Sequence, residues 1–282
     1  MPRVTEIFRH PLKSHGREAL AEVTLSQGAA MPWDRSWAVA HEISKANGQE
    51  WAACANFSRV AKAPQLMAIT ARLNEADQSL TLSHPNRKDF TFQPDDERQL
   101  SGFLAWVKPL MPADRAQSAR ILRLAERGFT DTDFPSISIN SHASLRALSE
   151  HMGQPLSPHR WRGNLWIDGL EPWVEHSWLG QKFRIGGVVF EGVEPIVRCL
   201  ATTANPDTGL RDADTLGALK ALCGHQHFGL SARVIAPGPL SPDDTLELSC
   251  SYLPPSPHLQ APLPPTCPRT CSHGGRDFSD AW

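Results

Sequence analysis

The sequence predicts a mainly β protein with some α-helix, arranged as two β-dominated lobes followed by a proline-rich tail. Three observations support this fold class. Short β-rich runs dominate the chain and are separated by clusters of Gly, Pro, Asn or Asp. Helical periodicity is confined to a few short stretches. Seven prolines lie between Ser251 and Pro268, where hydrophobic periodicity ends.

The first lobe is predicted to be a barrel or a strongly bent sheet. Its strand candidates are 4–8, 22–25, 37–41, 66–73, 80–82, 90–92 and 121–124. One amphipathic helix interrupts them over 100–107, where apolar residues recur at i, i+3, i+4 and i+7. The stretch 111–114 resembles a linker, so we expect a first domain over 1–112 and a second over 113–249.

The second lobe is also predicted to be β-rich. Its strand candidates are 137–139, 165–168, 183–190, 197–203, 231–236 and 245–248. Ser141 is the expected N-cap of a helix that ends at Gly153. Asp212 or Asp214 is expected to cap another helix, with Gly224 just beyond its end.

The tail over 250–282 is expected to be disordered, because its prolines and polar residues cannot bury enough apolar surface to offset the entropy of ordering. Cys267 and Cys271 fall in this tail, and we expect no function for them.

Composition and net charge limit the classes of function that we expect for this chain. With 40% hydrophobic and 21% charged residues and a net charge of -2, the chain is typical of a soluble globular protein. No basic run suggests nucleic acid or an anionic membrane as partner, and no apolar stretch is long enough to span a bilayer. The start lacks a signal-peptide core, so a cytoplasmic location is expected.

Cysteine usage argues against the common metal centres. The six cysteines include no Cys-x-x-Cys pair, so neither a zinc site nor an iron-sulfur cluster is expected. Cys199 stands out because Arg198 precedes it and the turn sequence 205–209 follows it. A neighbouring arginine is expected to lower the thiol pKa and favour the reactive thiolate. The alternative is a buried, inert thiol that serves only packing.

Three basic segments precede Cys199. They are 10–16 with Lys13 and Ser14, 32–37 with Arg35, and 158–164 with Arg160 and Arg162. Arg and Lys at loop ends are the usual means of holding a phosphate, so an anionic, phosphorylated ligand is one hypothesis. Solvated surface charges or local ion pairs are the alternative. The pair His225 and His227 has no third ligand at a suitable spacing and is expected to be a polar loop.

Taken in order, these motifs resemble one family. They are Pro11-Leu12-Lys13-Ser14, Asp34-Arg35-x-Trp37, Arg160-x-Arg162-Gly163-Asn164, Glu175-x-x-Trp178-x-Gly180, Arg198-Cys199-x-x-Thr202 through Gly209, and Phe228-Gly229 before Gly238. The set is similar to proteins with a molybdenum cofactor sulfurase C-terminal (MOSC) domain preceded by an N-terminal β-barrel domain. The mitochondrial amidoxime-reducing component and its bacterial relatives belong to this group. The resemblance covers about residues 1–249.

The resemblance implies a β-barrel lobe and a MOSC β-barrel lobe with a molybdenum cofactor of the molybdopterin type between them. Cys199 would be the thiolate on molybdenum and the catalytic residue. The residues implied to bind or support the cofactor are Lys13, Ser14, Arg35, Arg162, Asn164, Arg198 and Thr202. A soft thiolate suits a thiophilic metal, and basic residues suit a phosphorylated cofactor.

The implied reaction is the reduction of N-hydroxylated compounds, amidoximes or hydroxylamines, with His15 or His159 as candidate proton donors. Bacterial relatives often append a ferredoxin domain where this chain has its proline-rich tail, so electrons are expected from a separate ferredoxin- or cytochrome b5-like carrier. Gly163 stands where relatives commonly have Pro. The alternatives are a module that binds the cofactor without turnover or carries sulfur on Cys199, and a structural protein with an inert thiol.

Overall fold

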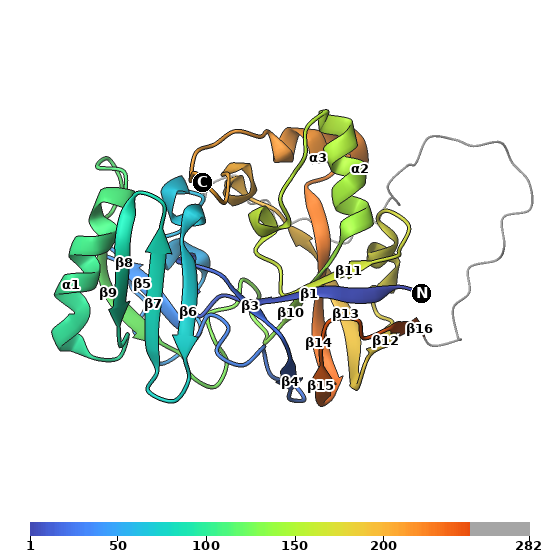
Figure 1. Ribbon diagram of the computed structural model, residues 1–282, viewed down its shortest axis with the longest axis horizontal. Helices are drawn as coiled ribbons and strands as arrows, with labels where there is room; N and C mark the ends of the chain where they lie inside the picture. The colour runs from blue at the N-terminus through green and yellow to red at the C-terminus, as the bar shows by residue number, and fades with distance from the viewer. Residues whose placement is uncertain (249–282) are drawn as a thin grey trace, which may run out of the picture.

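The fold is mainly β, as the sequence predicts. A computed structural model describes residues 1–248, and the predicted disordered tail lies outside this range. Of the residues that the structure describes, 35% are in strands and 22% in helices. Figure 1 shows two lobes side by side, one with α1 and strands β5 to β9, the other with α2, α3 and strands β10 to β16.

The second lobe is an eight-stranded mixed sheet in the order β16-β12-β13-β14-β10-β11-β1-β3. The strands are β1 (Arg3–Arg9), β3 (Glu18–Leu20), β10 (Ile137–Ser141), β11 (Leu165–Asp168), β12 (Lys182–Ile185), β13 (Val188–Val197), β14 (His227–Ala236) and β16 (Leu246–Leu248). Arg3 forms an antiparallel bridge with Thr245, and the N–H of Leu246 donates to the carbonyl of Pro2 at 2.9 Å. These bonds join β1 to the start of β16 and bring the ends of the sheet order together.

The first lobe contains two three-stranded sheets. One has the order β2-β5-β9 and the other β6-β7-β8. Their strands are β2 (Leu12–Lys13), β5 (Trp37–His41), β9 (Ser118–Arg123), β6 (Thr70–Asn74), β7 (Ser79–His84) and β8 (Arg87–Phe92). Helix α1 (Glu97–Val107) packs on β8 and β9 and buries Phe103, Trp106 and Val107.

The chain crosses between the lobes more than once. Strand β1 pairs with β11 of the second lobe, and β4 (Val23–Leu25) pairs with β15 (Gly238–Leu240). Strand β9 pairs with β5, although the expected division at residue 112 placed it in the second domain. The expected domain boundary at residue 112 therefore does not coincide with a boundary between hydrogen-bonded sheets. The division of the chain into two domains stays a prediction.

Two helices of the second lobe begin and end at the predicted caps. Helix α2 (His142–Met152) begins after Ser141, whose hydroxyl accepts from the N–H of Ser144, and ends at Gly153 in the left-handed conformation. Helix α3 (Thr215–Cys223) begins after Asp214 and ends at Gly224. In both cases local capping chemistry outweighs the weak hydrophobic periodicity.

Three predicted strands are wrong in their extent. The run 66–73 is a 3₁₀ helix, η2 (Pro64–Ala68), followed by β6. The run 183–190 is the hairpin of β12 and β13, turned by Gly186 and Gly187. The run 197–203 ends its strand at Val197 and continues as the 3₁₀ helix η6 (Leu200–Thr203). Apolar content alone does not distinguish these cases.

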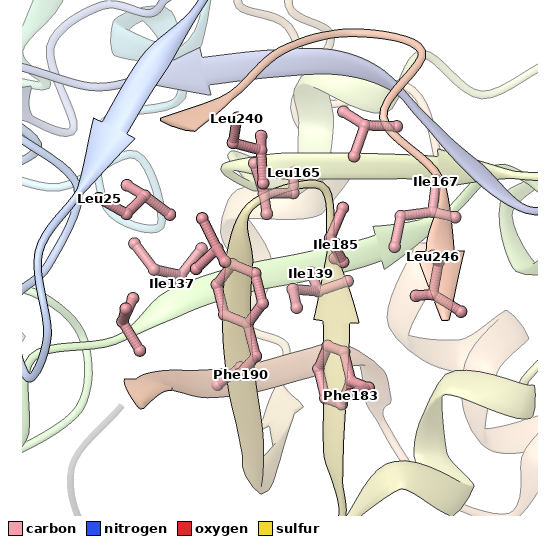
Figure 2. Close-up of a cluster of buried hydrophobic side chains, with 14 of the residues drawn as sticks. Leu25, Ile137, Ile139, Leu165, Ile167, Phe183, Ile185, Phe190, Leu240 and Leu246 are labelled. Atoms are coloured by element: carbon pink, nitrogen blue, oxygen red, sulfur yellow. The ribbon is translucent and has the colours of Figure 1, made fainter. Parts of the chain in front are cut away.

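The core of the second lobe lies inside its curved sheet. Figure 2 shows Ile137, Ile139, Leu165, Phe183 and Phe190 among the side chains that meet there. Such burial is worth about 1.5–3 kcal/mol for each large apolar side chain. In the part of the chain that the structure describes, no helix has the length and apolar character needed to cross a membrane.

Candidate functional site

Cys199 lies at the junction between strand β13 and the 3₁₀ helix η6. The backbone N–H of Arg198 donates to the carbonyl of Gln226 at 2.9 Å. Cys199 then caps η6, and its carbonyl accepts from the N–H and from the hydroxyl of Thr202, both at 3.2 Å. The partly buried thiol is therefore held on a backbone that is fixed on both sides.

Arg198 anchors this junction from inside the second lobe. Its buried guanidinium donates to the carbonyls of Phe228 (2.8 Å) and Trp161 (2.7 Å) and to the Oδ1 of Asn140 (2.8 Å). The guanidinium carbon also lies 5.5 Å from the ring centroid of Trp161. Since all three nitrogens donate to the protein, Arg198 orders the backbone at Cys199.

Arg198 lowers the pKa of the Cys199 thiol as expected, but burial outweighs its effect. Burial raises the pKa of the Cys199 thiol, and the charge of Asp131 raises it further. A backbone N–H from Ala201 and the Arg198 charge lower it by less than burial raises it. The thiolate therefore forms when a metal or an electrophile displaces the proton.

The three basic segments meet in the structure. Arg35 donates to the carbonyl of Arg162 at 3.0 Å, and Arg162 donates to the carbonyl of Gly16 at 3.0 Å. Lys13 is buried in the same segment as Gly16. Side chains from both lobes thus form one cationic cluster, defined here as Lys13, Arg35 and Arg162.

Asp131 connects the cationic cluster to the cysteine. It pairs with the ammonium of Lys13, which also donates to the carbonyl of Phe129 at 2.8 Å. Although the Asp131 side chain is 69% exposed, the charges of Lys13, Arg35 and Arg162 hold the pKa of its carboxyl below its usual range. The same carboxylate raises the pKa of the Cys199 thiol. Asp131 belongs to none of the sequence motifs, and its pairing with Lys13 becomes visible only in the fold.

The backbone is strained at the predicted site. Ser14, Arg35 and Arg162 have φ of 65°, 56° and 50°, in the left-handed region that favours glycine. Each such residue costs on the order of 1 kcal/mol and persists only where its surroundings impose it. Strain of this kind is enriched at ligand sites, and here it coincides with three of the residues selected from sequence.

The cluster has a surplus of positive charge. Its three cations face two carboxylates, Asp34 and Asp131. Asp34 is paired with Arg35 and accepts from the N–H of His10 at 2.7 Å. Burial and the nearby Arg162 lower the pKa of His10 to about 3, so its imidazole adds no charge at neutral pH. A bound anion would balance the remaining cation.

We assign the surplus positive charge of the cationic cluster to Arg162. Burial, followed by repulsion from Arg35 and Arg17, lowers the pKa of its guanidinium to about 9. Its Nη1 is buried and has no hydrogen-bond partner. A buried donor without an acceptor costs about 1–3 kcal/mol, more when charged, so this atom marks a place for an anionic oxygen.

Two further predicted cofactor residues serve the scaffold. The Oδ1 of Asn164 accepts from the N–H (3.1 Å) and hydroxyl (2.8 Å) of Ser138, and its Nδ2 donates to the carbonyl of Phe8 at 3.1 Å. The hydroxyl of Thr202 is bonded to the carbonyl of Cys199 and to the hydroxyl of Thr215. The side chains of Asn164, Thr202 and Arg198 are thus bonded within the protein, and their role in holding or supporting a cofactor stays a prediction.

The other sequence candidates are placed as follows. Ser14 is partly buried beside Lys13. Burial lowers the pKa of His15 to about 4, and its Nδ1 lies 2.8 Å from the carbonyl of Lys13. Burial, then Arg17, lowers the pKa of His159. Both imidazoles are neutral at pH 7, which argues against either as an acid that holds a spare proton.

Packing against Asn140 explains why a glycine occupies position 163. A Cβ added there would lie 1.8 Å from the Nδ2 of Asn140, whose Oδ1 receives a hydrogen bond from Arg198. The small residue at 163 therefore leaves room for the side chain that anchors Arg198.

Within residues 1–248, no three His, Cys, Asp or Glu side chains are arranged to hold a metal ion, and His225 and His227 are not at such a site.

Two family models match the chain in the order expected. Residues 1–119 match the MOSC N-terminal beta barrel domain, and residues 128–247 match the MOSC domain. The chain belongs to the MOSC family.

Named relatives of this MOSC protein are distant and partly matched. Mitochondrial amidoxime-reducing component 1 of Mus musculus is 31% identical over 104 residues, which is 36% of this chain and 30% of that protein. Molybdenum cofactor sulfurase of Caenorhabditis elegans is 32% identical over 124 residues, 42% of this chain and 17% of that protein. The matched stretch thus spans less than a third of either relative.

Solved structures show weaker similarity to this MOSC protein. The YUAD protein from Bacillus subtilis has a TM-score of 0.42 and 11% identity, covering 87% of this chain and 94% of its own. YiiM from Geobacillus stearothermophilus has a TM-score of 0.31 and 21% identity, covering 40% and 53%. At these scores they add nothing to the assignment.

The residues of this MOSC protein fit a phosphorylated molybdenum cofactor. The buried, unpartnered Nη1 of Arg162 and the surplus charge of the cationic cluster suit a phosphate. Cys199 offers one soft donor, which suits a metal whose other ligands come with a dithiolene. The charge of Asp131, which pairs with Lys13 of the cluster, also raises the pKa of the Cys199 thiol.

Proposed function

We propose that this MOSC protein binds a molybdenum cofactor between its lobes and reduces N-hydroxylated compounds such as amidoximes and hydroxylamines. The observation that carries the proposal is the buried Nη1 of Arg162, which lacks a partner within a cluster that has surplus positive charge. Asp131, which pairs with Lys13 of this cluster, also raises the pKa of the Cys199 thiol. The similarity to amidoxime-reducing components supports the reaction class.

Each residue has a distinct role in this proposal. Arg162 would donate to the cofactor phosphate, while Lys13 and Arg35 would contribute positive charge from the first lobe. Cys199 would lose its proton and ligate the metal, with its backbone held in place by Arg198. When bound, the cofactor would supply the two-electron redox chemistry.

The overall reaction is R–NHOH + 2 e⁻ + 2 H⁺ → R–NH₂ + H₂O, with the N–O bond broken and an N–H bond formed. The electrons come from a separate electron-transfer protein, ferredoxin-like or cytochrome b5-like. Because His15 and His159 are neutral at pH 7, neither stores a proton for this step.

A second candidate function is cofactor binding or sulfur transfer without turnover, with Cys199 carrying the sulfur. The similarity to molybdenum cofactor sulfurase favours this candidate.

The test begins with protein expressed in a host that makes the cofactor. We expect about one molybdenum per chain, lost in Cys199→Ala and in Arg162→Met, as in other one-cofactor oxidoreductases. Reduced methyl viologen then replaces the protein carrier, with benzamidoxime as substrate. Oxidation of viologen in step with benzamidine formation supports the reductase. Full molybdenum occupancy without turnover would favour the binding or sulfur-transfer function.

A further inference from the structure

One segment of the first lobe, 54–61, packs against loop 199–211, which carries the proposed metal ligand. Arg211 joins the two. Its Nη1 donates to the carbonyl of Leu200, the residue that directly follows the ligand. Its Nη2 donates to the carbonyl of Ala61 at 2.8 Å. One guanidinium therefore holds the two segments together across the lobes.

The segment from the first lobe contains a second thiol. Cys54 begins the 3₁₀ helix η1 (Cys54–Asn56), and the Nη1 of Arg59 donates to its Sγ at 3.0 Å. The Cys54 and Cys199 thiols are both partly buried. The charge of Cys54 raises the pKa of the Cys199 thiol, and this effect is larger than the opposite effect of Arg198, the adjacent residue. Because electrostatic effects fall with distance, the two sulfur atoms lie near each other across the lobes.

The surroundings of Cys54 are those of a thiol that reacts with peroxide. Such thiols are partly exposed, lie beside a cation and have a second cysteine nearby. Cys54 has the partial exposure, the Arg59 guanidinium on its sulfur, and Cys199 across the lobes. The guanidinium of Arg198, in contrast, donates to two carbonyls and to Asn140 rather than to the sulfur of Cys199. Cys54 is therefore the thiol that reacts first, and Cys199 is the thiol that resolves the product.

We propose that Cys54 and Cys199 form a reversible disulfide that joins the two lobes when the cofactor-free protein meets a peroxide. Hydrogen peroxide oxidises the Cys54 thiol to a sulfenic acid, and one water is released. The Cys199 thiol then attacks that sulfur, the S–S bond forms and a second water leaves. Two electrons have passed from the thiols to the peroxide, and a dithiol reductant returns them. This inference goes beyond the proposed function, because it needs neither the cofactor nor turnover.

The first experiment uses the full-length protein from a host that lacks the cofactor. The protein is reduced, freed of reductant and treated with hydrogen peroxide. We expect mass spectrometry to find the peptides of Cys54 and Cys199 linked, and dithiothreitol to separate them. Cys54→Ser should abolish the link. Cys223→Ser is the matched control and should leave it unchanged, because Cys223 is also partly buried but ends α3.

Arg59→Met tests the cation on the sulfur. This variant keeps both thiols and removes the donor to Cys54, so we expect the link to form roughly tenfold more slowly, as for the loss of one charged hydrogen bond. Thermal melting shows that each variant is folded. An unchanged rate in a folded Arg59→Met variant contradicts the assignment of Cys54 as the thiol that reacts first.

Dibromobimane gives a second readout that needs no oxidation, because it becomes fluorescent when its two arms react with neighbouring thiols. The reduced wild type should be bridged between Cys54 and Cys199, and Cys54→Ser should not. A wild type with no link between these residues in either experiment overturns the inference. A disulfide between Cys199 and any other cysteine also overturns it.

Protein loaded with molybdenum separates this inference from the proposed function. A metal on Cys199 should protect its sulfur, so peroxide should form no link in the loaded protein. A link that forms equally well with molybdenum bound refutes Cys199 as the metal ligand, while the disulfide of the cofactor-free protein stands.

Discussion

Arg162 is a buried cation whose surroundings do not satisfy it. Its Nη1 lacks a partner, Arg35 and Arg17 repel it, and its backbone is strained. Natural proteins retain such features where a ligand compensates for them. At the scale of single residues, this makes Arg162 the most direct test of the anion site.

Replacing Arg162 with methionine should separate ligand binding from stability. We expect the cofactor-free variant to melt at the wild-type temperature or higher, because an under-satisfied buried charge is removed. Molybdenum content should fall about tenfold or more, since a charged hydrogen bond is lost. Calorimetric melting and metal analysis check this. A large loss of stability with full occupancy would assign Arg162 to the scaffold.

Arg35 should behave differently, although the sequence presents it as an equivalent cation. Its guanidinium pairs with Asp34, whose side chain is fully buried. Arg35→Ala leaves that carboxylate with the N–H of His10 as a remaining donor, so we expect a loss of about 3 kcal/mol in denaturant unfolding. Adding Asp34→Asn should restore part of the loss, because the uncompensated charge is removed. Wild-type stability in Arg35→Ala would contradict the buried pair.

At the scale of elements, the contact between the loop before β11 and strand β10 supports the cysteine loop. Gly163→Ala would drive its Cβ into Asn140 and displace the acceptor of Arg198. We expect a loss of about 1–3 kcal/mol from overpacking, together with lower molybdenum content. In an Asn140→Ala background the same change should have little further effect, which a double-mutant cycle measures. Additive losses would show that the two positions are independent.

Glu175 connects the 3₁₀ helix η5 (Val174–Trp178) to α2. It is fully buried and accepts from the hydroxyl of Ser144 at 2.8 Å, and burial raises its pKa from 4.5 to about 7. A raised folded-state pKa stabilises the protein below pH 4.5, and this contribution is lost as pH rises through about 7.

Glu175→Gln keeps an acceptor for Ser144 and removes this titration. The stability difference between variant and wild type should therefore shift in favour of the variant by about 3 kcal/mol from acidic pH to above pH 7. Urea unfolding across this pH range measures the difference. A difference that does not change with pH would mean that the carboxyl is ionised equally in both states.

Elements with strong local signals were predictable. Trp37–His41 and Leu165–Asp168 were expected with the observed bounds, and Ser141 and Gly153 cap α2 as predicted. The failures are at positions where tertiary packing overrides an apolar run. Gly186 and Gly187 turn one predicted strand into a hairpin, and the hydrogen bonds of Arg198 end β13 ahead of Cys199.

At the scale of the whole molecule, the site combines both lobes. Lys13 and Arg35 come from the first 35 residues, and Arg162 and Cys199 come from the second lobe. A ligand bound by both should stabilise the native state by mass action. We expect the cofactor-loaded protein to melt several degrees above the cofactor-free protein. A ligand at a hundred times its Kd raises the free energy of unfolding by about 3 kcal/mol. Scanning calorimetry of both forms tests this, and Arg162→Met should reduce the difference. Equal melting temperatures would place the cofactor outside the interface.

The sequence by itself determined the mainly β class, the helix caps, the prominence of Cys199 and the basic segments, because these follow from residue types and short spacings. Only the tertiary structure decided which of those residues face a ligand. Arg35 and Arg198 look alike in sequence, yet one is bound to a buried carboxylate and the other to carbonyls beneath the cysteine. The charge environment of Asp131 and the packing role of Gly163 are likewise visible only in the tertiary structure. Both depend on contacts between segments that are distant in the sequence.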